Sequence, residues 1–173
     1  KAQKMKVDGA LEDWQSIKGY QATRGNTLHR DSKGWGDLVY QNKSGRNDIV
    51  DVRVAHDKKN IYFYVACAEP ITPSTDRSWM RLYIDIDRKR ESGWEGYDFV
   101  LNRIAPSAEE IVIERATSGA TWQRAGKVAY SVSENYMELA IPLELIGLTS
   151  EVAFELEFKW ADNIQSDNDV YEF

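Results

Sequence analysis

Apolar and polar residues alternate at every second position through most of this chain, and this pattern constrains the fold more than any other feature. Val50, Val52 and Val54 share one side of a segment while Asp51 and Arg53 share the other, as in a strand with one buried face. The pattern predicts strands at residues 50–54, 61–68, 79–85, 97–102, 110–115, 127–132, 136–141 and 153–161.

Helical signals are almost absent. A single helical turn is expected after Pro142, which suits a first helical position, and before Gly147, which suits a stop. A turn this short cannot connect parallel strands, because parallel pairing needs a long crossover. We therefore expect an all-β fold, an antiparallel β-sandwich of jelly-roll or immunoglobulin-like type.

The organisation of the chain points to one domain over residues 1–173, since no repeat or flexible linker divides it. Residues 20–47 lack the alternation and are rich in glycine, asparagine and charge, so a long functional or mobile loop is expected there. Strand character continues to the last residues, 170–173. This favours a domain from the C-terminal part of a longer protein.

Composition excludes several functional classes. The formal net charge is -6, so no global positive field would attract a nucleic acid. No apolar run approaches the ~18 residues that a membrane span requires. The single cysteine, Cys67, excludes an internal disulfide and a cysteine-based zinc site. Aromatic residues make up 12% of the chain, so the direction in which their rings point becomes the main functional question.

The segment 79–87 has two contrasting faces. Its even positions are apolar and are predicted to enter the core, whereas its odd positions mix rings with charges: Trp79, Arg81, Tyr83, Asp85 and Asp87. Rings beside planar polar groups suit a sugar, which has an apolar C–H face and an equator of hydroxyls. We interpret the odd face as a binding surface open to ligands. The alternative is a solvated face on which the charges form cross-strand pairs.

Other predicted strands can extend this surface. Asp98 and Asn102 alternate against Phe99 and Leu101. Lys159 alternates against an apolar set that includes Trp160, which is therefore expected in the core.

Several motifs occur in an order that resembles a known family. They are Val7-Asp8-Gly9-Ala10-Leu11-Glu12-Asp13-Trp14 at the start, the hairpin of residues 52–57 and 61–65, Leu82-Tyr83-Ile84-Asp85 followed by Ser92-Gly93-Trp94, then Ala140-Ile141-Pro142 and Trp160-Ala161-Asp162-Asn163. Together they resemble family 9 carbohydrate-binding modules and the related DOMON-like β-sandwiches over nearly the whole chain.

The resemblance implies non-catalytic binding of an oligo- or polysaccharide. It implies a parent protein with a catalytic domain that processes polysaccharide, a secreted, periplasmic or cell-surface location in a bacterium, and in some members structural calcium. Asn102 matches a sugar contact of the family. Arg81, Val100 and Lys159 stand where the family has Glu, Arg and Gln, and Trp79 and Trp94 lie near the loops that carry its stacking rings.

The expected site residues follow from these observations. The glycine-containing loop around Trp35 could place that ring over a ligand as a lid. A calcium site is expected because hard carboxylate oxygens suit this ion and a loop with Gly93 can close the shell. The sugar-binding set is Trp79, Arg81, Tyr83, Asp98, Asn102, Lys159, Trp94 and Trp35, and the calcium set is Asp85, Asp87 and Asp98.

Other functions remain as alternatives. The main one is a docking β-sandwich without sugar affinity, which packs exposed Tyr62 and Tyr64 against the parent's catalytic domain. A glycosyltransferase reading of Asp85-Ile86-Asp87 would need an α/β domain. A glycosidase would need two carboxyl groups at a set separation. Haem binding would need Met80 or Met137 with His29 or His56, but both methionines follow the apolar alternation and are expected in the core.

Overall fold

The computed structural model describes residues 5–27, 30–34, 36–118 and 120–165. Apart from two short 3₁₀ turns, η1 (Glu12–Trp14) and η2 (Leu143–Ile146), its regular elements are strands. These are β1 (Tyr20–Gln21), β2 (Arg30–Lys33), β3 (Val39–Asn42), β4 (Ile49–His56), β5 (Asn60–Cys67), β6 (Arg81–Asp85), β7 (Phe99–Leu101), β8 (Glu110–Ala116), β9 (Trp122–Ser133), β10 (Tyr136–Pro142) and β11 (Glu157–Ala161).

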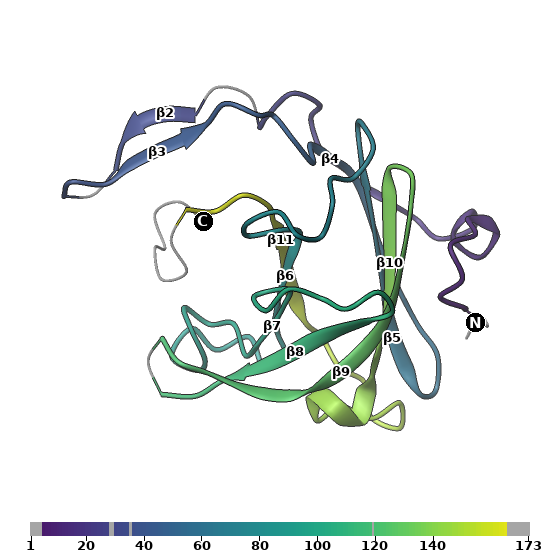
Figure 1. Cartoon of the computed structure of the whole chain (residues 1–173). Helices are drawn as coiled ribbons and strands as arrows, with labels where there is room; N and C mark the ends of the chain where they lie inside the picture. The colour runs from purple at the N-terminus through teal and green to yellow at the C-terminus, as the bar shows by residue number, and fades with distance from the viewer. Residues whose placement is uncertain (1–4, 28–29, 35, 119, 166–173) are drawn as a thin grey trace.

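Nine of these strands form one antiparallel sheet in the order β1-β4-β5-β10-β9-β8-β7-β6-β11. The sheet curls, so that its two halves face one another (Figure 1). Phe63 on β5 contacts Phe158 on β11 edge to face, with ring centroids 5.3 Å apart, although five strands separate β5 from β11 in the sheet order. The expected all-β antiparallel fold is confirmed, and its two layers belong to one continuous sheet.

The main core fills the inside of this curl. It collects the apolar alternation of six strands, and its members include Phe63, Leu82, Ile84, Leu101 and Ile113, none more than 2% exposed. The predicted core face of β6 is therefore confirmed. Trp160 packs against the same cluster, also as expected.

Part of the outer face is covered by the N-terminal segment. Trp14 packs there on Tyr64, with ring centroids 5.3 Å apart, and both side chains are buried. Glu138, which is 1% exposed, accepts hydrogen bonds from the Trp14 indole at 2.8 Å and from the backbone of Asp8 and Gly9. Gly9 has φ +78, a conformation that favours glycine. The opening motif thus fastens the N-terminal segment to β10.

Two expectations about local structure have different outcomes. The helical turn at residues 142–146 is confirmed as η2, and Gly147 ends it in the left-handed conformation. The prediction of a loop over residues 20–47 is wrong, because this segment contains β1 and the hairpin β2–β3. The hairpin projects away from the curled sheet (Figure 1). Strand character predicted at residues 170–173 lies outside the described residues.

In the described part of the chain, no helix has the length and apolar character needed to cross a membrane.

Candidate functional site

The odd-numbered face of β6 is buried, contrary to the prediction that it is open to ligands. Arg81 is 4% exposed and Tyr83 is 1% exposed. The Tyr83 ring contacts Trp94 and Tyr97, each at 5.6 Å between centroids, and Trp122 at 6.4 Å. These rings come from segments that follow β6 in sequence and fold back over it. Alternation identified the residues that share this face but carried no signal for what covers it.

Trp79 and Trp94 are also unavailable as the exposed stacking rings that were predicted. Trp94 is 4% exposed because it lies against Tyr83. Trp79 belongs to the main core together with Met80, rather than to the opposite face, and its indole donates to Thr72 O at 2.8 Å. The alternation fails here because Ser78 and Met80 have φ values of 51° and 39°, so the chain is not extended before β6 begins.

Three predicted residues nevertheless line one hollow. Trp79, Arg81 and Asn102 border a space of about 640 Å³ at the start of β6, together with Arg103 and Gln165. Asn102 Nδ2 donates to Met80 O at 2.7 Å, whereas its buried Oδ1 has no hydrogen-bond partner among the described residues. Arg103 makes a two-pronged pair with Glu114. These contacts show that much of the polar lining is engaged by the protein itself.

A larger hollow of about 750 Å³, here called the seam groove, lies where the two edges of the curled sheet approach each other. Its walls are β11 on one side and β1 with β4 on the other, and residues of the β2–β3 hairpin also line it. Of the predicted sugar-binding residues, Lys159 lines this groove.

The lining of the seam groove combines aromatic rings with planar polar groups. Phe158 and Trp160 come from β11, and Tyr40 from the hairpin. Tyr20 on β1 is the most exposed ring, at 66%. Besides Lys159, the planar or charged side chains in the lining are Asn26, Arg30, Asn42, Arg46, Asn47 and Asp162.

Sequence reasoning missed most of this groove, although it marked residues 20–47 as a functional or mobile loop. The missing information was the approach of that segment to β11, which is more than a hundred residues away in sequence. The Gln41 backbone N–H donates to Gln165 Oε1 at 2.9 Å across this separation. Trp35, the predicted lid, lies outside the described residues.

A partly buried ion network borders the seam groove through Arg46 and Asp162. Asp162 accepts from Met80 N at 2.8 Å through Oδ1 and from Arg46 Nε at 2.9 Å through Oδ2. Arg46 Nη1 also lies 3.3 Å from Asp76 Oδ2. Burial raises the pKa of Asp162 above its ordinary value, although Met80 N–H, Asn47 and Arg46 act to lower it.

Lys159 also lines the seam groove. Its pKa is lowered, first because burial removes water from the ammonium group and second because the positive charge of Arg30 repels it. Both residues line the seam groove, Lys159 from β11 and Arg30 from β2.

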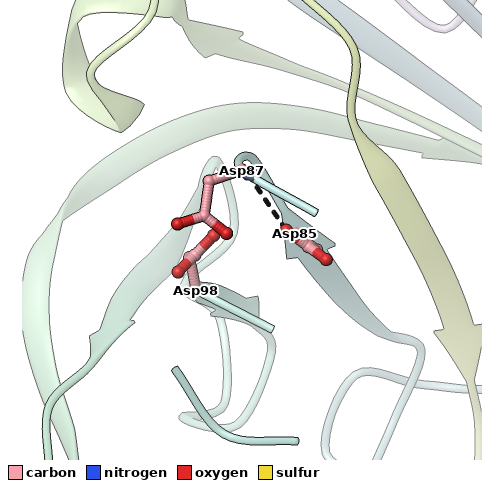
Figure 2. A group of neighbouring side chains, drawn as sticks. All are labelled: Asp85, Asp87 and Asp98. Atoms are coloured by element: carbon pink, nitrogen blue, oxygen red, sulfur yellow. Dashed lines mark hydrogen bonds between the residues drawn. The ribbon is translucent and has the colours of Figure 1, made fainter. Parts of the chain in front are cut away.

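The expected calcium residues lie together in a second place, between β6 and β7. Figure 2 shows Asp85 at the end of β6, Asp87 just beyond it and Asp98 beside β7. One ligand oxygen from each lies within 4.8 Å of the others. The pKa of Asp98 is raised, mainly by burial and then by the charges of Asp87 and Asp85, with Ile86 N–H and Arg115 acting against this.

The loop around the three carboxylates is held by its own contacts. Asp85 Oδ1 accepts from the backbone of Asp87 at 3.0 Å and of Arg88 at 2.6 Å, and Asp98 Oδ2 accepts from Ile86 N at 2.9 Å. Gly93 is required here, because its φ is +64 and a Cβ would come within 2.1 Å of Tyr97 O. Asp98 belongs to this cluster and is absent from the lining of the seam groove.

Other candidate chemistries lose their structural basis. Met80 and Met137 are both 0% exposed in the main core, as expected. Cys67 is equally buried, and burial with the nearby charges of Asp162 and Asp48 raises the pKa of its thiol to about 12. The α/β domain that a glycosyltransferase reading requires is replaced by an all-β sheet in the described residues.

Comparisons with protein-family models, with curated proteins and with solved structures find no match to this chain. The likeness to family 9 carbohydrate-binding modules therefore rests on the motifs in the chain itself. Function must be argued from the geometry of the seam groove.

Proposed function

We propose that this chain is a non-catalytic carbohydrate-binding domain and that the seam groove is its sugar site. The observation that carries the proposal is the lining of this groove, where rings such as Tyr20 and Trp160 stand among amide and guanidinium groups. A pyranose stacks its C–H face on a ring and directs its hydroxyls to planar hydrogen-bonding groups. A volume of about 750 Å³ also falls within the range typical of small-ligand sites.

The small number of carboxylates in the groove supports sugar binding rather than hydrolysis. A glycosidase places two carboxyl groups across the scissile bond, ~5–5.5 Å or ~6.5–9.5 Å apart. Among the described residues that line the groove, Asp162 is the only carboxylate, and both of its oxygens already accept hydrogen bonds. The proposed role is to hold sugar for a parent protein that processes polysaccharide, outside the cytoplasm of a bacterium.

The two tyrosines on which the docking alternative relied are not exposed. Tyr62 and Tyr64 are 4% and 6% exposed, because the N-terminal segment with Met5 and Trp14 covers them. A parent domain cannot pack on these two rings without displacing that segment.

The proposal is tested by calorimetric titration of the domain with a panel of mono- and oligosaccharides. Tyr20→Ala removes the exposed ring from the groove and is expected to weaken a measured affinity roughly tenfold, about 1.4 kcal/mol, because the sugar loses its stacking surface. Tyr20→Phe keeps the ring and is the matched control, with a sugar affinity expected near that of the unsubstituted domain. Saturable binding that Tyr20→Ala leaves unchanged would move the site elsewhere, and no saturable binding to any sugar would refute the function.

A further inference from the structure

The seam groove adjoins a second space, the hollow of about 640 Å³ at the start of β6, here called the β6 hollow. Arg46 lines the seam groove, and its side chain contacts two residues that line the β6 hollow. Arg46 Nη1 lies 3.3 Å from Asp76 Oδ2, and Arg46 Nη2 donates to Arg77 O at 2.5 Å. The two spaces therefore share a wall, in which Arg46 borders the groove and Asp76 borders the hollow.

The backbone brings the two linings together at a second place. Ala161 of the seam groove pairs with Arg81 of the β6 hollow in the register of β11 and β6. Two residues further along, Asn163 N donates to Ser78 O at 2.9 Å, and Ser78 also lines the hollow. The groove and the hollow are therefore neighbours at the end of β11 and the start of β6.

The shared wall reaches solvent at Asp76. The side chain of Asp76 is 36% exposed, against 14% for Arg46. Its carboxylate pairs with Arg46 through Oδ2 and accepts no hydrogen bond from the rest of the described chain. A carboxylate oxygen within reach of solvent is a strong acceptor for a ligand hydroxyl. A ligand that extends from one space into the other crosses this wall, where Asp76 can bind it.

The β6 hollow also offers neutral groups that suit a sugar. The hydroxyls of Ser74, Thr75 and Ser78 line it, and none of the three is hydrogen-bonded to another side chain or backbone group in the described part of the chain. A hydroxyl can both donate to and accept from the hydroxyls of a sugar. The hollow can therefore hold a further sugar residue without selecting for charge.

We propose that the seam groove and the β6 hollow are two parts of one extended site, which binds an oligosaccharide along its length while Asp76 accepts a hydroxyl between the two parts. This inference rests on the proposed carbohydrate-binding function and names the class of ligand, a glycan chain rather than a single terminal sugar.

The test is the dependence of affinity on chain length. Cello-, xylo-, manno- and chito-oligosaccharides, each from the monosaccharide to the hexasaccharide, are titrated into the domain in a calorimeter. In at least one series the hexasaccharide is expected to bind roughly tenfold more tightly than the disaccharide, because only the longer chain occupies both spaces. This gain exceeds the few-fold increase that the larger number of binding positions on a longer chain would give.

The outcomes separate the extended site from the function beneath it. A disaccharide that binds within a few-fold of the hexasaccharide in every series would overturn the extended site and leave carbohydrate binding standing. Failure of every member of all four series to bind would overturn both.

A variant of the shared wall then locates the crossing. Asp76→Ala is expected to weaken binding of the hexasaccharide roughly tenfold and to leave binding of the disaccharide unchanged, because only the longer chain crosses the wall. Asp37→Ala makes the same change at an exposed site outside both linings and is expected to alter neither affinity. Thermal melting verifies that both variants are folded. Equal losses for the two sugars in Asp76→Ala, or no loss for the hexasaccharide, would overturn the extended site.

Discussion

At the scale of single residues, the buried carboxylate of Glu138 serves the structure. Glu138 is 1% exposed and accepts from Trp14 Nε1 at 2.8 Å, from Asp8 N at 2.8 Å and from Gly9 N at 2.6 Å. One carboxylate thereby satisfies three donors of a segment more than a hundred residues away. The motif that resembles a sugar-binding family consequently acts here as a clamp on the fold.

Replacement of Glu138 should therefore destabilise the protein strongly. Glu138→Ala leaves three donors without their acceptor and is expected to lower the free energy of unfolding by about 3 kcal/mol. Glu138→Gln keeps one acceptor oxygen and should lower the free energy of unfolding by less. Urea denaturation monitored by tryptophan fluorescence measures the free energy of unfolding of both variants. Glu151→Ala, at an exposed site, is the control, and a Glu138→Ala midpoint equal to that of the control would contradict the clamp.

At the scale of elements, the β4–β5 hairpin shows how local chemistry sets a turn. Asp57 Oδ1 accepts from Lys59 N at 2.7 Å and from Asn60 N at 2.8 Å, and Oδ2 accepts from the Tyr62 hydroxyl at 2.8 Å. Burial alone would raise the pKa of Asp57, but these hydrogen bonds together lower it below its ordinary value. The ionised form of Asp57 therefore stabilises the hairpin.

This contribution depends on pH with a defined sign. Because the folded pKa of Asp57 lies below the unfolded value of about 3.9, the stabilisation is present above pH ~4 and disappears as the pH falls through the folded pKa. Asp57→Asn is expected to lower the free energy of unfolding by about 1 kcal/mol at pH 7 and by less near pH 3. Chemical denaturation of the variant and the unsubstituted protein at a series of pH values measures this loss. A loss that grows as the solution becomes more acidic would contradict the role of the ionised carboxylate.

The hairpin β2–β3 shows where element prediction failed. All four residues of β2 are exposed, and β3 buries only Tyr40. With polar residues on both faces, the strand has no apolar alternation for a sequence pattern to detect. The hairpin forms through pairing of its two strands, such as Ser32 with Tyr40, rather than through a buried face of its own.

At the scale of the whole molecule, the curl of the sheet decides which surfaces remain open. It brings the edge strand β11 opposite β1 and β4, and the seam groove lies between these edges. The same curl leaves the outer face of β6 to be covered by the loop with Trp94 and by Trp122 at the start of β9. The best candidate site is therefore at the sheet edges, whereas the segment 79–87 provides core.

Calcium binding between β6 and β7 stays a prediction. If Asp85, Asp87 and Asp98 share an ion, calcium binds the folded chain only and stabilises it by about 2.7 kcal/mol at a hundred times the dissociation constant. The melting temperature should then rise with added calcium and fall with a chelator. Asp98→Asn should abolish the rise, whereas Asp37→Asn, at an exposed site, should keep it. Equal melting temperatures in calcium and in chelator would contradict the site.

The sequence by itself determined the strands with an apolar face, their antiparallel pairing, the turn η2 and the side of β6 that enters the core. It also brought Asp85, Asp87 and Asp98 into one candidate cluster, because they flank two strands that pair directly. These are local properties, set by a period of two residues and by short turns. Only the tertiary structure decided that Arg81 and Tyr83 are buried and that Lys159 and Tyr20 line one groove, because coverage of a strand depends on segments that are distant along the chain.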